Sequence, residues 1–323
     1  MTGTLAPSVT ATAQRCAQVL GEVERVIVGK RDAVAQVLLG ILASGHILIE
    51  DLPGLGKTLL ARTFATTLGL EFTRVQFTPD MLPSDLTGSP ILDPRTGEVV
   101  FRRGPVFTNL LLGDEINRTP PKTQAALLEA MAEGQVSIDG QTHLLSQPFV
   151  VLATENPIEY EGTYPLPEAQ LDRFVARIRL GYLDEAGEAE MARRRLERGS
   201  APPRPAEVLD ASALLAMRES LEQVHLDDDL LGYIVRLVAA TRSHPQISVG
   251  ASPRGTLAVI QLARGHAALD SRDYVIPEDV KAVAVPALAH RLVLRPEMWV
   301  RRVTGEDLIT EILTAEPVPR ASR

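Results

Sequence analysis

The sequence predicts an α/β protein, a mostly parallel sheet covered by helices on both faces, followed by a small all-α domain. Short apolar runs alternate with stretches of helical periodicity over the first 200 residues. The segment 199–205 contains three prolines and cannot continue a helix. Beyond this break the apolar spacing is helical throughout. We therefore expect two domains, an α/β core over residues 1–200 and a helical domain over residues 206–323.

The two periodicities assign the elements of the first domain. Helical spacing predicts helices, and short apolar runs predict strands. Two segments contain a turn sequence between strand-like residues, Asp93-Pro94-Arg95-Thr96-Gly97 in one and Asp139-Gly140 in the other, which predicts hairpins. The expected helices are 12–28, 33–44, 58–68 and 120–133; the expected strands are 47–50, 72–77, 110–115, 149–153 and 174–180; the expected hairpins are 91–101 and 136–144.

The second domain contains helical patterns alone. We expect four helices, and no regular structure after residue 314, where the chain approaches its end. The expected helices are 211–224, 229–243, 253–269 and 277–294.

Residues 47–58 are the most informative stretch of the chain. An apolar strand leads into a loop rich in Pro and Gly, which ends in Gly56-Lys57-Thr58 and opens a helix. This arrangement points backbone N–H groups at a triphosphate, while Lys57 reaches the β- and γ-phosphates and Thr58 offers its hydroxyl to Mg²⁺. Asp51 stands where the general pattern has its first Gly, so the loop entry must differ. The alternative is an ordinary turn, which the flanking strand and helix disfavour.

A second buried-strand run ends in two carboxylates, Asp114 and Glu115. Ligands of parallel sheets bind beyond the carboxyl ends of the strands. Asp114 is therefore placed to hold Mg²⁺ beside Thr58, and Glu115 to polarise the water that attacks the γ-phosphate. The alternative is a strand end capped by two solvated acids.

These motifs resemble those of the MoxR branch of the AAA+ ATPases. The resemblance covers about residues 19–294 and is carried by several long blocks. These are Pro53-Gly54-Leu55-Gly56-Lys57-Thr58, the segment 74–85, Asp114-Glu115-Ile116-Asn117-Arg118, Ala153-Thr154-Glu155-Asn156-Pro157, Leu166 to Phe174, and Gly250-Ala251-Ser252-Pro253-Arg254.

The resemblance implies a P-loop core, a helical lid over the nucleotide, and ATP with Mg²⁺ as cofactors. It places Val28 and Gly29 against the adenine ring, although the same segment also reads as a helix C-cap. It implies Thr58 and Asp114 as the metal-holding residues. The implied ATP contacts are Val28, Gly29, Pro53, Gly54, Leu55, Gly56, Lys57, Thr58, Leu59 and Arg254.

Three further residues of the implied catalytic set have local alternatives. Asn156 resembles the sensor that orients the attacking water, although Asn before Pro157 is also a common turn start. Arg173 resembles the arginine finger that enters a neighbouring subunit's site; a salt bridge to Asp172 or Glu168 is its alternative, and Arg177 is the reserve finger. Arg254 resembles a second sensor on the lid, with a surface arginine as the alternative. The implied catalytic residues are Lys57, Glu115, Asn156 and Arg173.

The resemblance also implies biology that the residues alone do not. It suggests a ring, expected to be a hexamer, whose two hairpins face the pore and act on a client protein. The implied work is chaperone-like remodelling, maturation or metal insertion, often with a partner that carries a von Willebrand factor A domain. This step is analogy. The alternatives are the motor subunit of a metal chelatase, a nucleic-acid-associated AAA+ motor, and a nucleotide switch that barely turns over.

The composition of the chain disfavours some of these functional classes. The net charge of −8 argues against a general nucleic-acid binder. No run of 18 apolar residues predicts a membrane span, and the N-terminus has no leader pattern. The single Cys16 lies on an apolar helical stripe, which predicts a core residue and favours the cytoplasm. The six histidines are scattered without an i, i+4 pair, so we expect no metal site among them.

Overall fold

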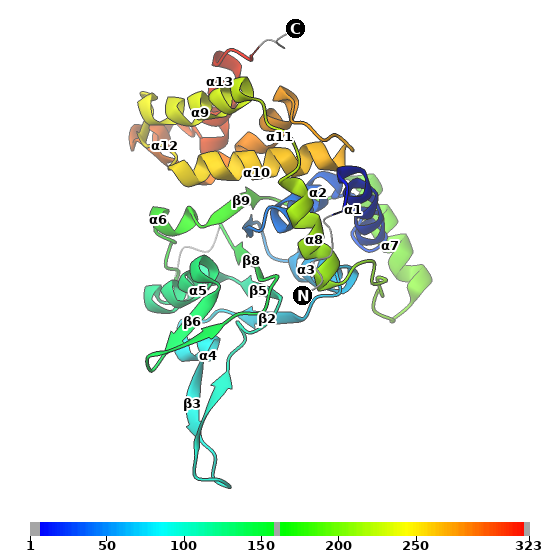
Figure 1. Ribbon diagram of the computed structural model, residues 1–323, viewed down its shortest axis with the longest axis vertical. Coiled ribbons are helices and arrows are strands. Elements are labelled where there is room, and N and C mark those ends of the chain that lie inside the picture. The colour runs from blue at the N-terminus through cyan, green and yellow to red at the C-terminus, as the bar shows by residue number, and fades with distance from the viewer. Residues whose placement is uncertain (1–6, 158–161, 320–323) are drawn as a thin grey trace.

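The computed structural model describes residues 7–157 and 162–319, and the outermost residues of the two expected domains, 1–6 and 320–323, lie outside this range (Figure 1). Five parallel strands form its central sheet in the order β2-β5-β8-β1-β9. The strands are β1 (His46–Glu50), β2 (Phe72–Gln76), β5 (Leu110–Asp114), β8 (Val150–Glu155) and β9 (Phe174–Ile178). All five lie within about two residues of the expected strands.

Helices cover both faces of this sheet because its three central strands, β5, β8 and β1, are apolar on both sides. In β1, Ile47 and Ile49 belong to one buried cluster with helices α1 (Val9–Glu24), α2 (Arg31–Leu42) and α3 (Lys57–Thr67). The intervening Leu48 belongs to a second cluster on the opposite face, with helix α5 (Pro121–Glu133). The predicted doubly covered sheet is confirmed.

Two hairpins extend away from the sheet, as expected. The first, β3 (Gly88–Leu92) and β4 (Val99–Arg103), follows the short helix α4 (Pro83–Thr87) and projects furthest from the body (Figure 1). The second is β6 (Gln135–Ile138) and β7 (Gln141–Leu144). Phe101 of the first stacks on His143 of the second, with ring centroids 4.1 Å apart, so the hairpins contact each other.

The second region is helical but richer than four helices. After α6 (Glu168–Leu171) and α7 (Glu185–Arg198), the chain forms α8 (Ala211–Leu221), α9 (Asp228–Ser243), α10 (Pro253–Leu269), α11 (Pro277–Leu288), α12 (Glu297–Arg301) and α13 (Gly305–Ala315). Two 3-10 turns, η1 (Ile116–Arg118) and η2 (Ala289–Arg291), and a small ribbon of β10 (Ile247–Val249) and β11 (Val293–Leu294) complete the fold.

Two expectations for this region are wrong. The helix expected over 277–294 ends at Leu288, because η2 turns Arg291 toward the core, where its guanidinium donates to the Phe174 carbonyl at 2.7 Å. The count of four helices missed the short α12 and the longer α13. Helix α13 begins at a capping box: Thr304 N donates to Asp307 Oδ2 at 2.9 Å, and the Thr304 hydroxyl accepts from Asp307 N at 3.2 Å. Leu308, Ile309 and Ile312 are buried on its inner face.

One apolar core connects the two regions. The cluster that covers the α1–α3 face also contains lid residues as distant in sequence as Ile312. Cys16 lies in this core, and burial raises the pKa of its thiol to about 12, which confirms the prediction of a structural cysteine. Across residues 7–157 and 162–319, no helix is both long and apolar enough to cross a bilayer.

Candidate functional site: two cavities at the carboxyl ends of the strands and an arginine cavity at the amino ends

The loop after β1 is shaped to leave backbone amides free. Gly54 and Gly56 have φ of 84° and 88°, the left-handed region where a side chain is strained. Gly56 is the N-cap of α3 and provides no side-chain cap, so the first N–H groups of the helix keep their hydrogen-bonding capacity for a ligand. No acidic residue lies in the first turn to repel an anion.

Lys57 is held inside this loop. Its side chain is buried, and its ammonium donates to the Asp51 carbonyl at 2.5 Å. Burial lowers the pKa of Lys57, while the carboxylates of Asp51, Asp114 and Glu115 oppose that shift. A phosphate group would supply further negative charge to an ammonium that has already lost most of its water.

A cavity of about 460 Å³ at the carboxyl ends of the strands, which we name the phosphate cavity, unites most of the predicted site. It brings the loop, the acid pair and the sensor candidate into one space, although they come from three separate parts of the sequence. Its lining includes the predicted residues Pro53, Gly54, Gly56, Lys57, Thr58, Leu59, Asp114, Glu115 and Asn156.

Two residues that were not predicted as site residues from the sequence also line the phosphate cavity. Arg74 and Gln76 are two apart in β2 and point to one side of the strand. Arg74 donates to Asp114 Oδ2 at 2.7 Å, and Gln76 donates to Glu115 Oε2 at 2.7 Å. The sequence signal that could have identified these two residues is a pair of polar residues at alternate positions near the end of a strand.

Glu115 is fixed in an unusual backbone conformation. Its φ of 58° and ψ of 52° lie in the left-handed region, which a non-glycine residue seldom adopts. The Thr154 hydroxyl accepts from Glu115 N at 2.9 Å and donates to Asp114 Oδ1 at 2.6 Å. The strand beside β5 therefore holds both acids in place.

The donor set suits a magnesium ion. Thr58 offers a hydroxyl and Asp114 a carboxylate to the same cavity, and hard oxygen ligands are those that Mg²⁺ prefers. Both Asp114 oxygens already accept hydrogen bonds, from Arg74 and Thr154, so a metal would compete with Arg74 or bind Asp114 through water. The residues present fit the ion.

A second cavity, of about 310 Å³, adjoins the loop, and we name it the base cavity. Val28, which the resemblance placed against the adenine, lines it together with Leu55, Leu59 and residues 180–183. Gly29 is not in the lining, but its φ of 67° favours glycine, and an added Cβ would lie 2.8 Å from a Leu183 methyl, which would have to shift. The cavity is mostly apolar, which is typical of a purine site.

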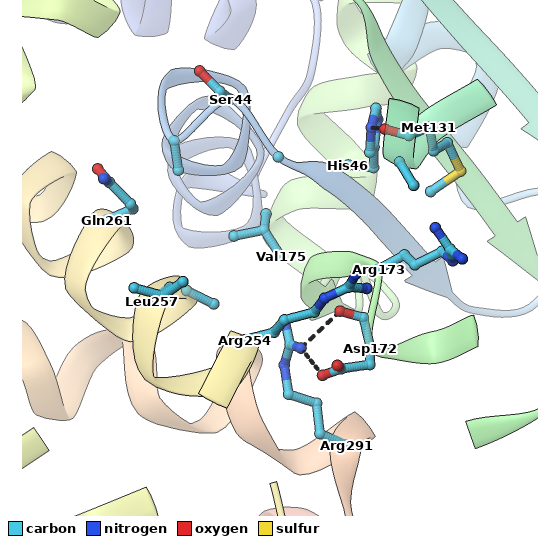
Figure 2. A pocket seen from close by; sticks show the side chains of 14 residues that line it. Ser44, His46, Met131, Asp172, Arg173, Val175, Arg254, Leu257, Gln261 and Arg291 are labelled. Carbon is cyan, nitrogen blue, oxygen red and sulfur yellow. Dashed lines mark hydrogen bonds and ion pairs between the residues drawn. The ribbon is translucent and has the colours of Figure 1, made fainter. Parts of the chain in front are cut away.

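Arg173 and Arg254 lie in a different place. They line a third cavity of about 310 Å³, which we name the arginine cavity, with His46, Asp172 and Arg291 (Figure 2). Phe174, next to Arg173, pairs with His46 at the start of β1, whereas the phosphate loop follows the end of β1. A five-residue strand separates the two ends, roughly 15 Å. The structure does not bring Arg173 or Arg254 to the phosphate cavity of the same chain.

The salt-bridge alternative for Arg173 has no support in the described residues. Asp172 is paired with Arg291 and also accepts from the Ser252 hydroxyl at 2.8 Å. Arg173 forms no ion pair in the described part of the chain, and its Nε is buried without a hydrogen-bond partner there. Arg177, the reserve candidate, bonds to Glu306 at 2.7 Å and lies 3.5 Å from Glu50.

Two acids and one imidazole meet in the lid, a cluster that histidine spacing alone did not predict. The possible ligand atoms of His266, Asp270 and Asp279 lie within 4.8 Å of one another. Arg272 already supplies a cation there, donating to Asp279 at 2.6 and 2.7 Å. We assign the group to the stability of the lid.

Comparisons with known proteins agree with this geometry. Residues 46–176 match the family described as ATPases associated with various cellular activities, and residues 239–312 match an AAA lid domain. An uncharacterized Bacillus subtilis protein is 47% identical over 92% of both chains. The chaperone MoxR1 of Mycobacterium tuberculosis is 43% identical over 93% of this chain and 81% of its own. The chain belongs to the MoxR family of AAA+ ATPases.

A crystal structure from Cytophaga hutchinsonii shows the same fold, with a TM-score of 0.90 and 40% identity over 97% of both chains. The predicted family and fold class are thus confirmed, and the protein is an ATPase. In this MoxR-family chain, the residues that match the AAA lid domain, 239–312, extend from the end of α9 into α13.

Proposed function

We propose that this ATPase hydrolyses Mg²⁺-ATP at the interfaces of a ring of six copies. The separation of two complementary cavities supports this most. The phosphate cavity contains the loop, both acids and Asn156 but neither Arg173 nor Arg254, whereas the arginine cavity contains these two arginines, which form no ion pair with another described residue. In a closed ring each copy can present its arginine cavity to the phosphate cavity of the next copy.

Each residue of the phosphate cavity then has one role. Lys57 and the α3 amides bind the β- and γ-phosphates, and Thr58 and Asp114 hold the ion, which neutralises phosphate charge when bound. Glu115, aimed by its strained backbone and by Gln76, accepts a proton from the attacking water. Asn156, 4% exposed after β8, orients that water.

Arg173 and Arg254 act on the neighbour's γ-phosphate. A guanidinium cannot lose its charge at neutral pH, and its fork binds phosphate oxygens in two places. The buried, unbonded Nε of Arg173 is a donor that such a phosphate would satisfy. Because both arginines line one cavity, we assign Arg254 to the neighbour's nucleotide as well, rather than to that of its own chain.

The energy of hydrolysis drives chaperone-like remodelling of a client protein. The first hairpin presents Leu92 and Val99, which are 64% and 70% exposed, on an element far from the sheet. The relative MoxR1 is named as a chaperone, which supports the same class. Client maturation, metal insertion and a partner with a von Willebrand factor A domain belong to this proposal, as do a cytoplasmic location and the domain division at residues 200 and 206.

The decisive experiment is Glu115→Gln. We expect the variant to bind Mg²⁺-ATP with the wild-type dissociation constant by calorimetry, and to lose at least about a hundredfold in turnover. The exposed Glu129→Gln on α5 is the matched control and should keep full activity. Equal turnover in Glu115→Gln and wild type would overturn the role of Glu115. Absence of Mg²⁺-dependent ATP binding in the wild type would overturn the whole proposal.

A further inference from the structure

Asp51 stands where the general phosphate loop has a glycine, and both oxygens of its carboxylate accept hydrogen bonds. Oδ2 accepts from Leu180 N at 2.6 Å and from Gly181 N at 2.8 Å, and Oδ1 accepts from Leu52 N at 3.1 Å. The residue is 7% exposed. Charge-assisted hydrogen bonds of this kind, shielded from water, are stronger than neutral ones. A glycine at this position could make none of them.

The two amides that Asp51 binds belong to the wall of the base cavity. Residues 180–183 connect β9 to α7 and face Val28 and Leu59 across that cavity. Gly181 has φ of 66°, and its carbonyl accepts from Lys30 Nζ at 2.6 Å. Asp51 holds the N–H side of Gly181 and Lys30 the C=O side, so this wall is fixed from both directions.

The main chain of Asp51 reaches the rest of the site. Its carbonyl accepts from Lys57 Nζ at 2.5 Å, and its N–H donates to the Glu155 carbonyl at 3.1 Å, one residue before Asn156. An ammonium has three donor protons, so Lys57 can keep this bond and still bind phosphate. One residue thus contacts the phosphate lysine, the sensor strand and the base cavity.

We propose that Asp51 is a positioning residue that sets the base cavity at a fixed distance from the phosphate loop. A nucleotide must place its base and its phosphates at the same time, and the cost of ordering the 180–183 wall is removed if Asp51 has ordered it beforehand. Asp51 therefore raises the affinity for a nucleotide relative to that for a triphosphate without a base. This inference rests on the proposed function, since it needs ATP as the ligand of both cavities.

Its test compares two ligands that share a triphosphate but differ in the base. We measure Mg²⁺-ATP and Mg²⁺-tripolyphosphate by calorimetry with wild type and Asp51→Ala. The dissociation constant for ATP should rise about tenfold or more, as expected for two lost hydrogen bonds to a charged group. The dissociation constant for tripolyphosphate should change less than about twofold. An equal change for both ligands, or none for ATP, overturns the proposal.

Two more variants keep the result interpretable. Asp51→Asn keeps one acceptor oxygen for the amides of the 180–183 wall and should retain part of the preference for ATP over tripolyphosphate. This variant tests the proposal even if Asp51→Ala fails to fold. Asp279→Ala removes another buried acid that accepts from a backbone amide, Ile276 N at 2.8 Å, but in the lid. It should lower the melting temperature without altering the ratio of the two dissociation constants. Wild-type protein that binds no ATP would refute the proposed function, whereas normal ATP binding with an unchanged Asp51→Ala ratio refutes this inference alone.

Discussion

The phosphate cavity and the arginine cavity lie at opposite ends of the same sheet and differ in how their charges are balanced. In the phosphate cavity each acid has a polar partner: Arg74 and Thr154 bind Asp114, and Gln76 binds Glu115. In the arginine cavity, among the described residues, Asp172 is taken by Arg291, and Arg173 and Arg254 have no acid.

This difference has a physical meaning. A satisfied network keeps its geometry before the ligand arrives, which is what a catalytic site needs. The partly buried guanidinium of Arg173 has lost some of its water without gaining an acid among the described residues, which costs free energy unless an anion is supplied from outside, whereas the exposed Arg254 keeps its water. In the proposed ring, the first cavity is a half-site whose geometry is set in advance, and the second is a half-site that a negatively charged group of another molecule completes.

The largest expected effect comes from breaking the second half-site. Arg173→Ala should lower turnover by about 10³-fold, the range known for arginine fingers, because the charge of the transition state loses its fork of donors. The affinity of a single chain for ATP should stay within about twofold, because Arg173 does not line its own phosphate cavity. Steady-state rates and calorimetry measure the two quantities, with the exposed Arg25→Ala as the control.

Mixing variants tests whether the halves come from different copies. Rings of Arg173→Ala and Lys57→Ala subunits contain interfaces with an intact loop on one side and an intact arginine on the other. Activity should reappear in such mixtures although each variant alone is inactive. Mixed rings as inactive as the pure variants would mean that both residues serve one chain.

Arg254→Ala should have the next largest effect. We expect turnover to fall about 30-fold, less than for Arg173, because Arg254 is the more exposed of the two, so water would screen its attraction to the phosphate more strongly. Rescue in mixed rings with Lys57→Ala should follow the same pattern as for Arg173. A rise in the ATP dissociation constant of the isolated chain would instead place Arg254 over its own nucleotide.

Glu155, the neighbour of Asn156 in the phosphate cavity, allows a test of how an acid near this cavity is balanced, through the dependence of stability on pH. Burial, and next the charge of Glu50, raise the pKa of Glu155 to about 7. The native state therefore binds this proton more tightly than the unfolded chain does. The stabilising effect is complete below about pH 4.5, the usual range of a glutamate, and is lost as pH rises to about 7.

Glu155→Gln should remove this dependence. The free energy of unfolding of the variant should rise relative to wild type by about 2 kcal/mol between pH 5 and pH 8. Thermal unfolding at both values measures the difference, and Glu129→Gln provides the control. A constant difference across this range would show that Glu155 is ionised throughout.

The smallest effect concerns how firmly the first half-site is held. Gln76→Ala removes the 2.7 Å hydrogen bond to Glu115 and should lower turnover about fivefold, equivalent to about 1 kcal/mol. The dissociation constant for ATP should not change, because Gln76 contacts Glu115, the proposed proton acceptor, and not the phosphates. A loss of affinity without a loss of turnover would count against this positioning role.

Much of the first half-site was predictable because its signals are local. The run from Ile47 to Thr58 encodes a strand, a glycine turn and a helix start in consecutive residues, and Asp114 and Glu115 end an obvious strand. Backbone preferences and apolar periodicity act over a few residues, so the sequence expresses them directly. The helix α13 was predictable too, from the capping box at Thr304, but it was missed.

The rest depends on contacts between distant parts of the chain. Arg74 and Gln76 join the site only because β2 lies beside β5 in the strand order, and Asp51 reaches Leu180 across 129 positions. No local pattern reports such neighbours.

By itself, then, the sequence determined that a triphosphate loop, an acid pair and a helical lid exist, since each is written in short-range propensity. Only the tertiary structure decided that Arg173 and Arg254 lie together at the amino ends of the strands, away from the loop. Strand order and lid packing are set by the burial of apolar surface far apart in sequence, and this places charges where no spacing rule could put them.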